Sequence, residues 1–329
     1  MPVSVILPLY NGRRYLAEAV QSVSRQTRPP DELIVVDDGS TDGGVELLEG
    51  IPAPFPVKIV VQENAGQSAA RNEGVRVAGG ELLAIRDQDD AWHPEHLAVL
   101  CAAFRDPFVG WSYSDFDEID GSGRTVTLSF LNEHGVSHPK RSLGACLGGD
   151  LMVIPSASVI RRTAFDAWGG FDEALQGYED DDLYVRAFRS GWRLVYCRLA
   201  LTRFRIHDTS SSANGLFVES RVRFSKKLEA AVADDRRLNR YYFRDLVAPR
   251  FFATSLDDYV HAVSDRNWHN AETALITLKY FARRRRDYKA IRWKLALVSN
   301  PRLFRHLMQI HDSLPSRLRL NRNPVLKLR

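Results

Sequence analysis

The sequence predicts an α/β protein with a doubly wound, mostly parallel sheet, followed by an α-helical extension. Three observations lead to this fold class. Apolar runs typical of buried strands alternate with helical patterns over the first hundred or so residues. Polar turns follow these strands, which places the turns together at one rim of a parallel sheet. Beyond residue 215 the strand patterns stop and helical periodicity takes over.

Four apolar runs near the start of the chain are typical of buried strands. The first, Val3–Leu7, is nearly continuous in apolar residues, as expected for a strand that is covered on both faces. Between the runs, apolar residues recur at helical spacing. The strands are expected at Val3–Leu7, Leu33–Val36, Val57–Val61 and Glu81–Ile85, and the helices near residues 16–23, 69–77 and 97–104.

The region from residue 109 to residue 212 is less regular. The stretch Leu128–Gly149 contains glycines, a proline and little periodicity, so we expect a mobile loop over the site there. Further strands are expected near residues 111–116, 156–160, 192–196 and 201–206, and a helix over residues 181–190.

The most informative stretch is acidic and runs from Ile85 to Pro94. It places Asp87, Asp89 and Asp90 in the turn that leaves the fourth strand. Three carboxylates so close together repel one another unless a cation lies among them. Mg²⁺ and Mn²⁺ prefer oxygen ligands and often join one or two carboxylates to the phosphates of a substrate. The stretch therefore indicates a divalent cation site, with a plain solvated acidic turn as the alternative.

The composition is that of an ordinary globular protein, but the charge is divided unevenly. The 329 residues carry a formal net charge of +4, which results from −10 over residues 1–215 and +14 over residues 216–329. Such a basic extension suggests contact with a membrane or an acidic partner. No signal peptide or transmembrane span is expected, and the three scattered cysteines are expected to pack as small apolar residues in a reducing compartment.

Several motifs, taken in order, resemble the inverting family 2 glycosyltransferases of GT-A fold, of the type that builds bacterial polysaccharides and other glycans. The resemblance covers roughly residues 2–212, and the ordered set is more specific than any one motif. The motifs are the run Val3–Asn11, the turn Val35–Asp42, the segment Asn64–Asn72, the acidic stretch Asp87–Pro94, the runs Gly169–Glu173 and Gly177–Arg186, and Arg205-Ile206-His207 followed by serines.

For the metal, the resemblance implies a site made by Asp89 and His207. Asp89 would be the direct carboxylate ligand of Mn²⁺ or Mg²⁺, and His207 lies in an Arg-x-His-x-x-Ser setting that completes such a site in this family. Asp87 would hold the ribose or the water shell of the metal. Asp90 is expected to anchor the loop or cap the helix that follows. For His207, an ordinary surface or core imidazole is the alternative.

For catalysis, the resemblance implies Asp180 as the base that takes the proton of the acceptor hydroxyl. Glu179 would orient Asp180 or bind the acceptor. Both residues open a predicted helix, where acidic residues are common for structural reasons alone. Tyr178 stands between Gly177 and Glu179, where many relatives place the glycine directly before the glutamate, so the register of this acidic run departs from the family pattern.

For the donor, the resemblance implies a nucleotide-sugar site along the rim. A tyrosine can stack on a nucleobase, and an aspartate can accept its imide N–H, which favours a UDP- or dTDP-sugar. The residues implied are Pro8, Tyr10, Asn11, Asp38, Arg71, Asp87 and Gln88.

The predicted organisation is a catalytic domain over residues 1–215 and a basic helical extension over residues 216–329. The extension would associate with an anionic membrane surface, where a lipid-linked acceptor is presented. The alternative is a solvated helical extension that packs on its own domain or on a second subunit in a homodimer. The expected location is cytoplasmic, with peripheral attachment to the inner membrane as an option. No nucleic-acid-binding pattern accompanies the charge.

Two other functions remain open at this point. One is a sugar nucleotidylyltransferase, which usually has a Gly-rich first loop with a basic residue, whereas the loop Leu9–Arg14 matches that pattern poorly. The other is a non-catalytic nucleotide-sugar-binding adaptor at a membrane, whose acidic motifs would be damaged. Asp87, Asp89, Asp180 and His207 are all present, so the sequence favours the transferase.

Overall fold

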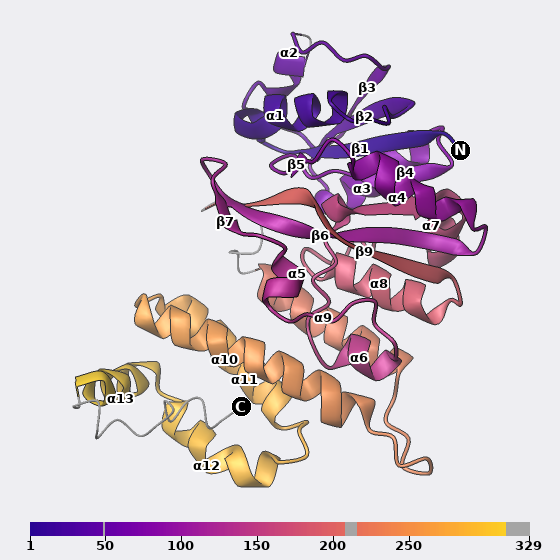
Figure 1. Ribbon diagram of the computed structural model, residues 1–329. Coiled ribbons are helices and arrows are strands. Elements are labelled where there is room, and N and C mark those ends of the chain that lie inside the picture. Colours follow the sequence, from indigo (N-terminus) through magenta and orange to yellow (C-terminus); the bar gives the residue numbers. More distant parts are fainter. Residues whose placement is uncertain (49, 208–215, 314–329) are drawn as a thin grey trace. The chain divides into compact units, whose positions relative to one another are not determined.

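The computed structural model describes residues 1–48, 50–207 and 216–313, which fall into two compact units (Figure 1). The first unit consists of residues 1–143 and 151–213, and the second of residues 144–150 and 214–329. The sequence placed a boundary near residue 215 and did not anticipate that the short stretch 144–150 groups with the C-terminal helices.

The first unit is built on a mixed sheet, which has nine strands in the part of the chain that the structure describes. Its strand order is β3-β2-β1-β4-β8-β6-β9-β5, and β7 pairs with β6. The first four of these strands are parallel to one another. They are β1 (Val3–Leu9), β2 (Glu32–Asp37), β3 (Val57–Val61) and β4 (Leu82–Ile85).

The rest of the sheet is mostly antiparallel. Strand β8 pairs antiparallel with both β4 and β6, whereas β6 and β9 run parallel to each other. The long strand β9 spans both segments that the sequence predicted as separate strands. The strands are β5 (Ala91–Trp92), β6 (Val109–Asp120), β7 (Thr125–Thr127), β8 (Ser158–Arg161) and β9 (Arg193–Ile206).

Helices cover both faces of the parallel strands, as the alternation of side chains along a strand requires. On one face, Val5 and Leu7 of β1 pack in a core cluster with Leu16 of α1 and Leu97 of α4. On the other, Ile34 and Val36 of β2 pack with Ala70 of α3. The helices are α1 (Arg13–Ser24), α2 (Gly44–Leu48), α3 (Gln67–Val77), α4 (His96–Ala102), α7 (Arg162–Trp168) and α8 (Glu179–Arg189).

One glycine explains how closely α3 approaches the sheet. A Cβ atom on Gly74 would lie 2.4 Å from Cγ2 of Ile6, which is too close for any larger residue without a shift of the backbone. This close approach lets Gln67 and Arg71 of α3 reach Asp87, which follows β4.

The predicted loop over residues 128–149 contains two short helices, α5 (Phe130–Glu133) and α6 (Leu143–Leu147). Asp115 of β6 holds the first of them, because its carboxylate accepts hydrogen bonds from the backbone N–H groups of Leu131 and Asn132, at 2.8 and 3.2 Å. This part of the prediction was wrong about secondary structure, since a short helix held by one carboxylate carries little periodicity of its own.

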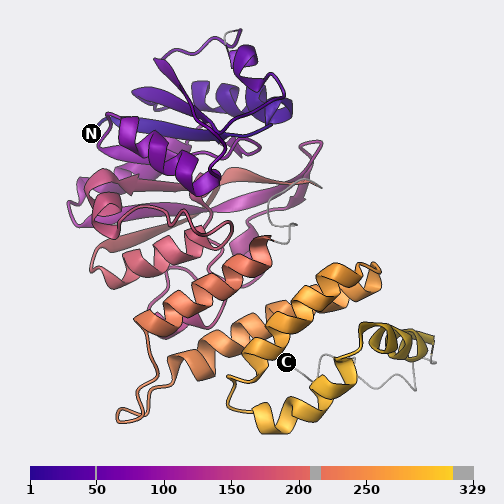
Figure 2. The ribbon, with the colours of Figure 1, turned by 180° about the vertical axis from the view of Figure 1, so that it is seen from behind.

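The second unit is helical where the structure describes it, as the sequence predicted (Figure 2). Buried residues of α10 and α11 form its interior, among them Phe251, Leu256 and Phe281. Arg221 of α9 is buried and pairs with Asp258 of α10 at 2.6 Å. The helices are α9 (Leu216–Ala231), a π-helical turn (Phe243–Val247), α10 (Ala248–Ser264), α11 (Trp268–Ala282), α12 (Tyr288–Val298) and α13 (Pro301–Ser313).

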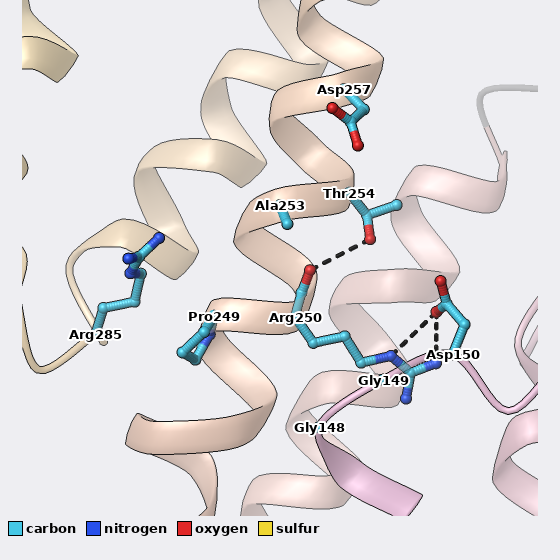
Figure 3. Close-up of a pocket in the computed structure, with 9 residues that line it drawn as sticks. All are labelled: Gly148, Gly149, Asp150, Pro249, Arg250, Ala253, Thr254, Asp257 and Arg285. Carbon is cyan, nitrogen blue, oxygen red and sulfur yellow. Dashed lines mark hydrogen bonds and ion pairs between the residues drawn. The ribbon is translucent and has the colours of Figure 1, made fainter. Parts of the chain in front are cut away.

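The stretch 144–150 is attached to α10 by an ion pair. Nε and Nη2 of Arg250 both donate to Oδ1 of Asp150, at 3.1 and 2.9 Å (Figure 3). A hollow of about 350 Å³ lies beside this pair, and Thr254, Asp257 and Arg285 also line it. Because Arg250 is 100 residues away from Asp150 in the chain, local sequence patterns give no sign of this contact.

None of the helices in the described ranges combines the length and the apolar composition that crossing a bilayer would require.

Candidate active site

Polar side chains from several strand ends gather at one rim of the sheet. Strand β1 ends at Leu9, β2 at Asp37 and β4 at Ile85, and these three strands are parallel neighbours. The predicted site residues follow these strands directly. In an open α/β sheet, the crevice outside the carboxyl ends of the strands is where ligands bind.

Gln88 fastens the first rim turn to the acidic turn. Its side-chain Oε1 accepts from the backbone N–H of Tyr10 at 2.8 Å, and its Nε2 donates to the carbonyl of Tyr10 at 3.1 Å. A Cβ atom on Gly12 would lie 2.2 Å from Oε1 of Gln88, so only glycine leaves room for this arrangement. Gln88 was predicted to bind the nucleotide sugar, and in the structure its amide group bonds to the backbone of Tyr10. The ring of Tyr10 lies at the surface and is 49% exposed.

Asn11 and Asp38 also bind the protein's own backbone. Oδ1 of Asn11 accepts from the N–H of Thr41 at 2.9 Å, which joins the first and second rim turns. The carboxylate of Asp38 is buried and accepts from Nε2 of Gln62 and from the N–H groups of Ala65 and Gly66, at 2.7 to 2.9 Å. An ionised carboxylate has about four acceptor positions, so these three bonds leave one of them. Pro8 is buried at the end of β1, beneath this turn.

Arg71 of α3 joins two carboxylates that lie far apart in the chain. Its Nη2 donates to Oδ1 of Asp87 at 2.6 Å, and its Nη1 donates to Oε1 of Glu179 at 2.9 Å. All three side chains are largely buried, with exposed fractions of 2%, 14% and 9%. Phe171 lies under the guanidinium, whose carbon is 5.2 Å from the ring centre.

The charge state of Arg71 follows from these partners. Burial alone would lower its pKa, but the facing carboxylates of Asp87 and Glu179 outweigh that effect and raise the pKa above its usual value. Arg71 was predicted to bind the nucleotide directly. In the structure it fixes Asp87, whose two side-chain bonds both end on Oδ1. Direct binding of the nucleotide by Arg71 stays a prediction.

The acidic turn is stabilised by a second buried arginine, which the sequence prediction did not assign. Arg86 is fully buried and donates to the backbone carbonyls of Asp87 and Asp90. Burial lowers its pKa to about 10, so it stays a cation at neutral pH. The repulsion expected among the three carboxylates is the signal that could have identified it.

The side chain of Asp90 bonds to the protein backbone and stabilises the acidic turn. Its Oδ1 accepts from the N–H of Arg205 at 2.9 Å, which ties the acidic turn to the end of β9. Burial, together with the nearby carboxylates of Asp89 and Asp87, raises the pKa of Asp90 well above its usual value. This geometry agrees with the anchoring alternative for Asp90 rather than with the helix cap, since its side chain bonds to β9.

Asp89 and His207 meet, although 118 residues separate them. Oδ2 of Asp89 lies 2.8 Å from Nε2 of His207, and both side chains are partly accessible, at 23% and 13%. Arg205 fixes the backbone at Asp89, because its Nε donates to the carbonyl of Asp89 at 2.7 Å. Its Nη2 donates to the carboxylate of Glu18 at 2.6 Å. Residues 208–210 of the Arg-x-His-x-x-Ser motif lie outside the described residues.

The donor atoms of this pair fit a divalent cation. A carboxylate oxygen and an imidazole nitrogen lie side by side, and metal ions of the Mg²⁺ and Mn²⁺ type commonly take their remaining ligands from substrate phosphates and water. Among the described residues, no group of three or more His, Cys, Asp or Glu side chains is placed to hold a metal ion. A cation at Asp89 and His207 would therefore take its other ligands from a bound substrate or from water.

Helix α8 brings Glu179 and Asp180 to the same site. Glu179 is held twice, by Arg71 and by the N–H of Gly177, which donates to its Oε2 at 2.9 Å. Asp180 is only partly buried, and its Oδ1 accepts from the N–H of Asp181 at 2.8 Å. Loss of water contact and the neighbouring carboxylates of Glu179 and Asp181 raise the pKa of Asp180 well above that of an ordinary aspartate.

The comparisons with known proteins agree on one family. The model of the family described as "Glycosyl transferase family 2" matches residues 4–169. YwdF of Bacillus subtilis, named an uncharacterized glycosyltransferase, is 31% identical over 57% of this chain and 68% of its own length. YibD of Escherichia coli, with the same description, is 41% identical over 64% of this chain and 63% of its own length. The match to alr2836 of Nostoc, 38% identical, covers 38% of this chain and only 40% of that relative.

Solved structures share the fold over most of the chain. TarS of S. aureus, residues 1–349 in complex with UDP-GlcNAc, is 20% identical with a TM-score of 0.65, covering 93% of this chain and 89% of that one. The mannosyltransferase PcManGT of Pyrobaculum calidifontis, in complex with GDP-Man and Mn²⁺, is 18% identical with a TM-score of 0.56, covering 96% and 81%. These likenesses confirm the predicted GT-A fold.

The buried bridge made by Arg71 can be tested by removing its charge. We expect Arg71→Met to lower the free energy of unfolding by about 3–5 kcal/mol, because Asp87 and Glu179 would be left buried without a cation. Urea unfolding followed by circular dichroism measures the change. Arg76→Met is the matched control on the same helix. Its side chain is 69% exposed and, among the described residues, pairs with Glu73, so we expect a far smaller loss than for Arg71→Met. Equal losses in the two variants would contradict the bridge.

Proposed function

The chain belongs to glycosyl transferase family 2, and we propose that it moves a sugar from a nucleoside-diphosphate sugar to a hydroxyl group of a glycan or lipid-linked acceptor, with inversion at the anomeric carbon. The observation that carries this proposal is the network at the rim. One buried arginine connects Asp87, on the predicted donor side, with Glu179, next to the predicted base Asp180. Donor site and base are thereby held in one rigid arrangement.

A pyrimidine nucleotide is the donor that the rim favours. Tyr10 offers an exposed ring for stacking, and the buried Asp38 keeps one acceptor position for an imide N–H. Of the structural neighbours, TarS was solved with UDP-GlcNAc and PcManGT with GDP-Man. The fold thus accommodates either class of base, and the proposal of a UDP- or dTDP-sugar rests on the rim residues of this chain.

Asp89 and His207 are proposed to hold Mn²⁺ or Mg²⁺. When bound, such a cation would offset the negative charge that develops on the departing diphosphate. The PcManGT complex, which shares the fold, contains Mn²⁺. Arg205 and Asp90 would act on this site only indirectly, because they fix the backbone of the acidic turn against β9.

Asp180 is proposed to accept the proton of the acceptor hydroxyl. The acceptor oxygen bonds to the anomeric carbon while the bond from that carbon to the diphosphate oxygen breaks, and the proton of the hydroxyl passes to a carboxylate oxygen of Asp180. The raised pKa makes this aspartate a stronger base than an ordinary one. Glu179 is less suited to that role, because it is buried and each of its oxygens already accepts a hydrogen bond, one from Arg71 and one from the N–H of Gly177.

Donor binding can be tested by thermal shift. We expect one class among UDP-, dTDP- and GDP-sugars to raise the melting temperature in Mn²⁺ or Mg²⁺ and to lose most of that effect in EDTA. Asp89→Ala should abolish the metal-dependent part of the shift. Glu95→Ala, which removes an exposed acid just beyond the acidic turn, should retain it. A wild-type protein that responds to no nucleotide with metal would contradict the donor site.

The base can be tested by its pH dependence. We expect Asp180→Asn to lower kcat by about 10²- to 10⁴-fold while the donor-induced thermal shift is unchanged. In the wild-type protein, kcat/KM should fall as the pH drops through the raised pKa of Asp180, since the protonated carboxyl accepts no further proton. This decline should begin well above pH 3.9, roughly the ordinary aspartate value. A variant that retains both the rate and the acidic decline would exclude Asp180 as the base.

A further inference from the structure

A strongly basic surface lies on the second unit, outside the rim site. Residues 283–306 contain nine Lys and Arg residues and one acid, Asp287. Asp287 is paired with Arg285, whose Nε and Nη2 donate to Oδ1 and Oδ2 of Asp287 at 2.8 and 2.7 Å. The remaining positive charge is therefore not offset within the segment. Arg283 and Arg286 are both exposed.

Helix α12 shows how this surface is built. Ile291, Leu295 and Val298 are buried, and they lie on one face of the helix because their spacing follows the helical repeat. The opposite face carries Lys289 and Arg292, both exposed and three positions apart. A helix with this division of residues packs on its own unit with one side and presents cations with the other.

A second, apolar strip runs beside the cations. Ala290, Trp293 and Ala296 are exposed and repeat every three residues along the same outer side of α12. Trp293 is 59% exposed, an unusual position for the largest apolar side chain. Leu303 of α13, next to Arg302, is also 49% exposed.

We propose that this face of α12, formed by Lys289, Arg292 and Trp293, binds an anionic lipid bilayer. The row of cations and the apolar strip beside it match the charged headgroup layer of a bilayer and the less polar layer beneath it. The cations meet anionic headgroups, and the indole ring takes the interfacial position that tryptophan prefers. A nucleic acid would use the cations and could stack a base on the indole, but it gives no role to the exposed alanines on either side of it.

The inference does not rest on the transfer reaction, because binding is measured without donor or acceptor. Flotation of the full chain with vesicles is the test. We expect binding to vesicles of equal parts phosphatidylcholine and phosphatidylglycerol, and little binding to phosphatidylcholine alone. Lys289→Gln/Arg292→Gln should weaken the binding by roughly 10- to 30-fold, since each cation near such a surface contributes about 1 kcal/mol. Equal binding to both kinds of vesicle would overturn the proposal.

A charge-matched control separates this face from the overall charge. Arg236→Gln/Arg237→Gln removes the same charge from two exposed positions of the same unit, and we expect it to retain most of the binding. If both double variants lose binding equally, the α12 face has no special role and the proposal fails. Circular dichroism of each variant confirms that the fold is retained.

Trp293 gives a readout that charge alone does not. In the wild-type protein, adding anionic vesicles should shift tryptophan fluorescence to the blue, and Trp293→Phe should remove most of that shift. Trp293→Ala should also weaken flotation. Binding that is insensitive to Trp293→Ala, and is equally tight to a single-stranded oligonucleotide, would point to a polyanion site and overturn the membrane assignment.

Discussion

The buried guanidinium of Arg71 is the interaction on which the rim site depends. It comes from α3 and binds Asp87, which follows β4, and Glu179, which opens α8. A buried pair of carboxylates without this cation would repel each other and carry a large desolvation cost. The close approach of α3 to β1, made possible by Gly74, is what brings the arginine there. The packing of the helix on the sheet therefore also positions the arginine of the site.

The polar residues of the site fall into two groups, those that bond to the protein itself and those that stay accessible. Gln88, Asn11 and Glu179 use their side chains to hold the rim turns and α8 in place. Tyr10, Asp180 and the pair of Asp89 and His207 are at least partly accessible, as the proposed ligand contacts require. Arg86 and Arg205 donate to backbone carbonyls of the acidic turn. Their positive charges therefore lie close to the carboxylates of that turn and reduce the repulsion among them. Such preorganised charge is what transfer to or from a diphosphate requires.

Much of this fold could be predicted from the sequence, because apolar runs and turns are local signals. The parallel strands, the family and the helical C-terminal region were predicted correctly. The roles within the site were harder, since a pattern shows that Arg71 or Asp38 lies at the rim but not which atoms take up its hydrogen bonds. Arg71 meets Glu179 across 108 residues, and Asp150 meets Arg250 across 100. The assignments of Asp89, His207 and Asp180 to metal and base stay predictions.

A double-mutant cycle on kcat/KM tests most directly whether Arg71 makes the donor side and the acceptor side a single unit. Asp87→Asn and Glu179→Gln would be measured alone and together, with Arg71 intact and with Arg71→Met. With the arginine present, we expect the two losses to be non-additive, with a coupling of about 0.5–3 kcal/mol. With Arg71→Met, the coupling should disappear. Additive losses in the presence of Arg71 would show that the two carboxylates act independently, and would contradict the central role of this arginine.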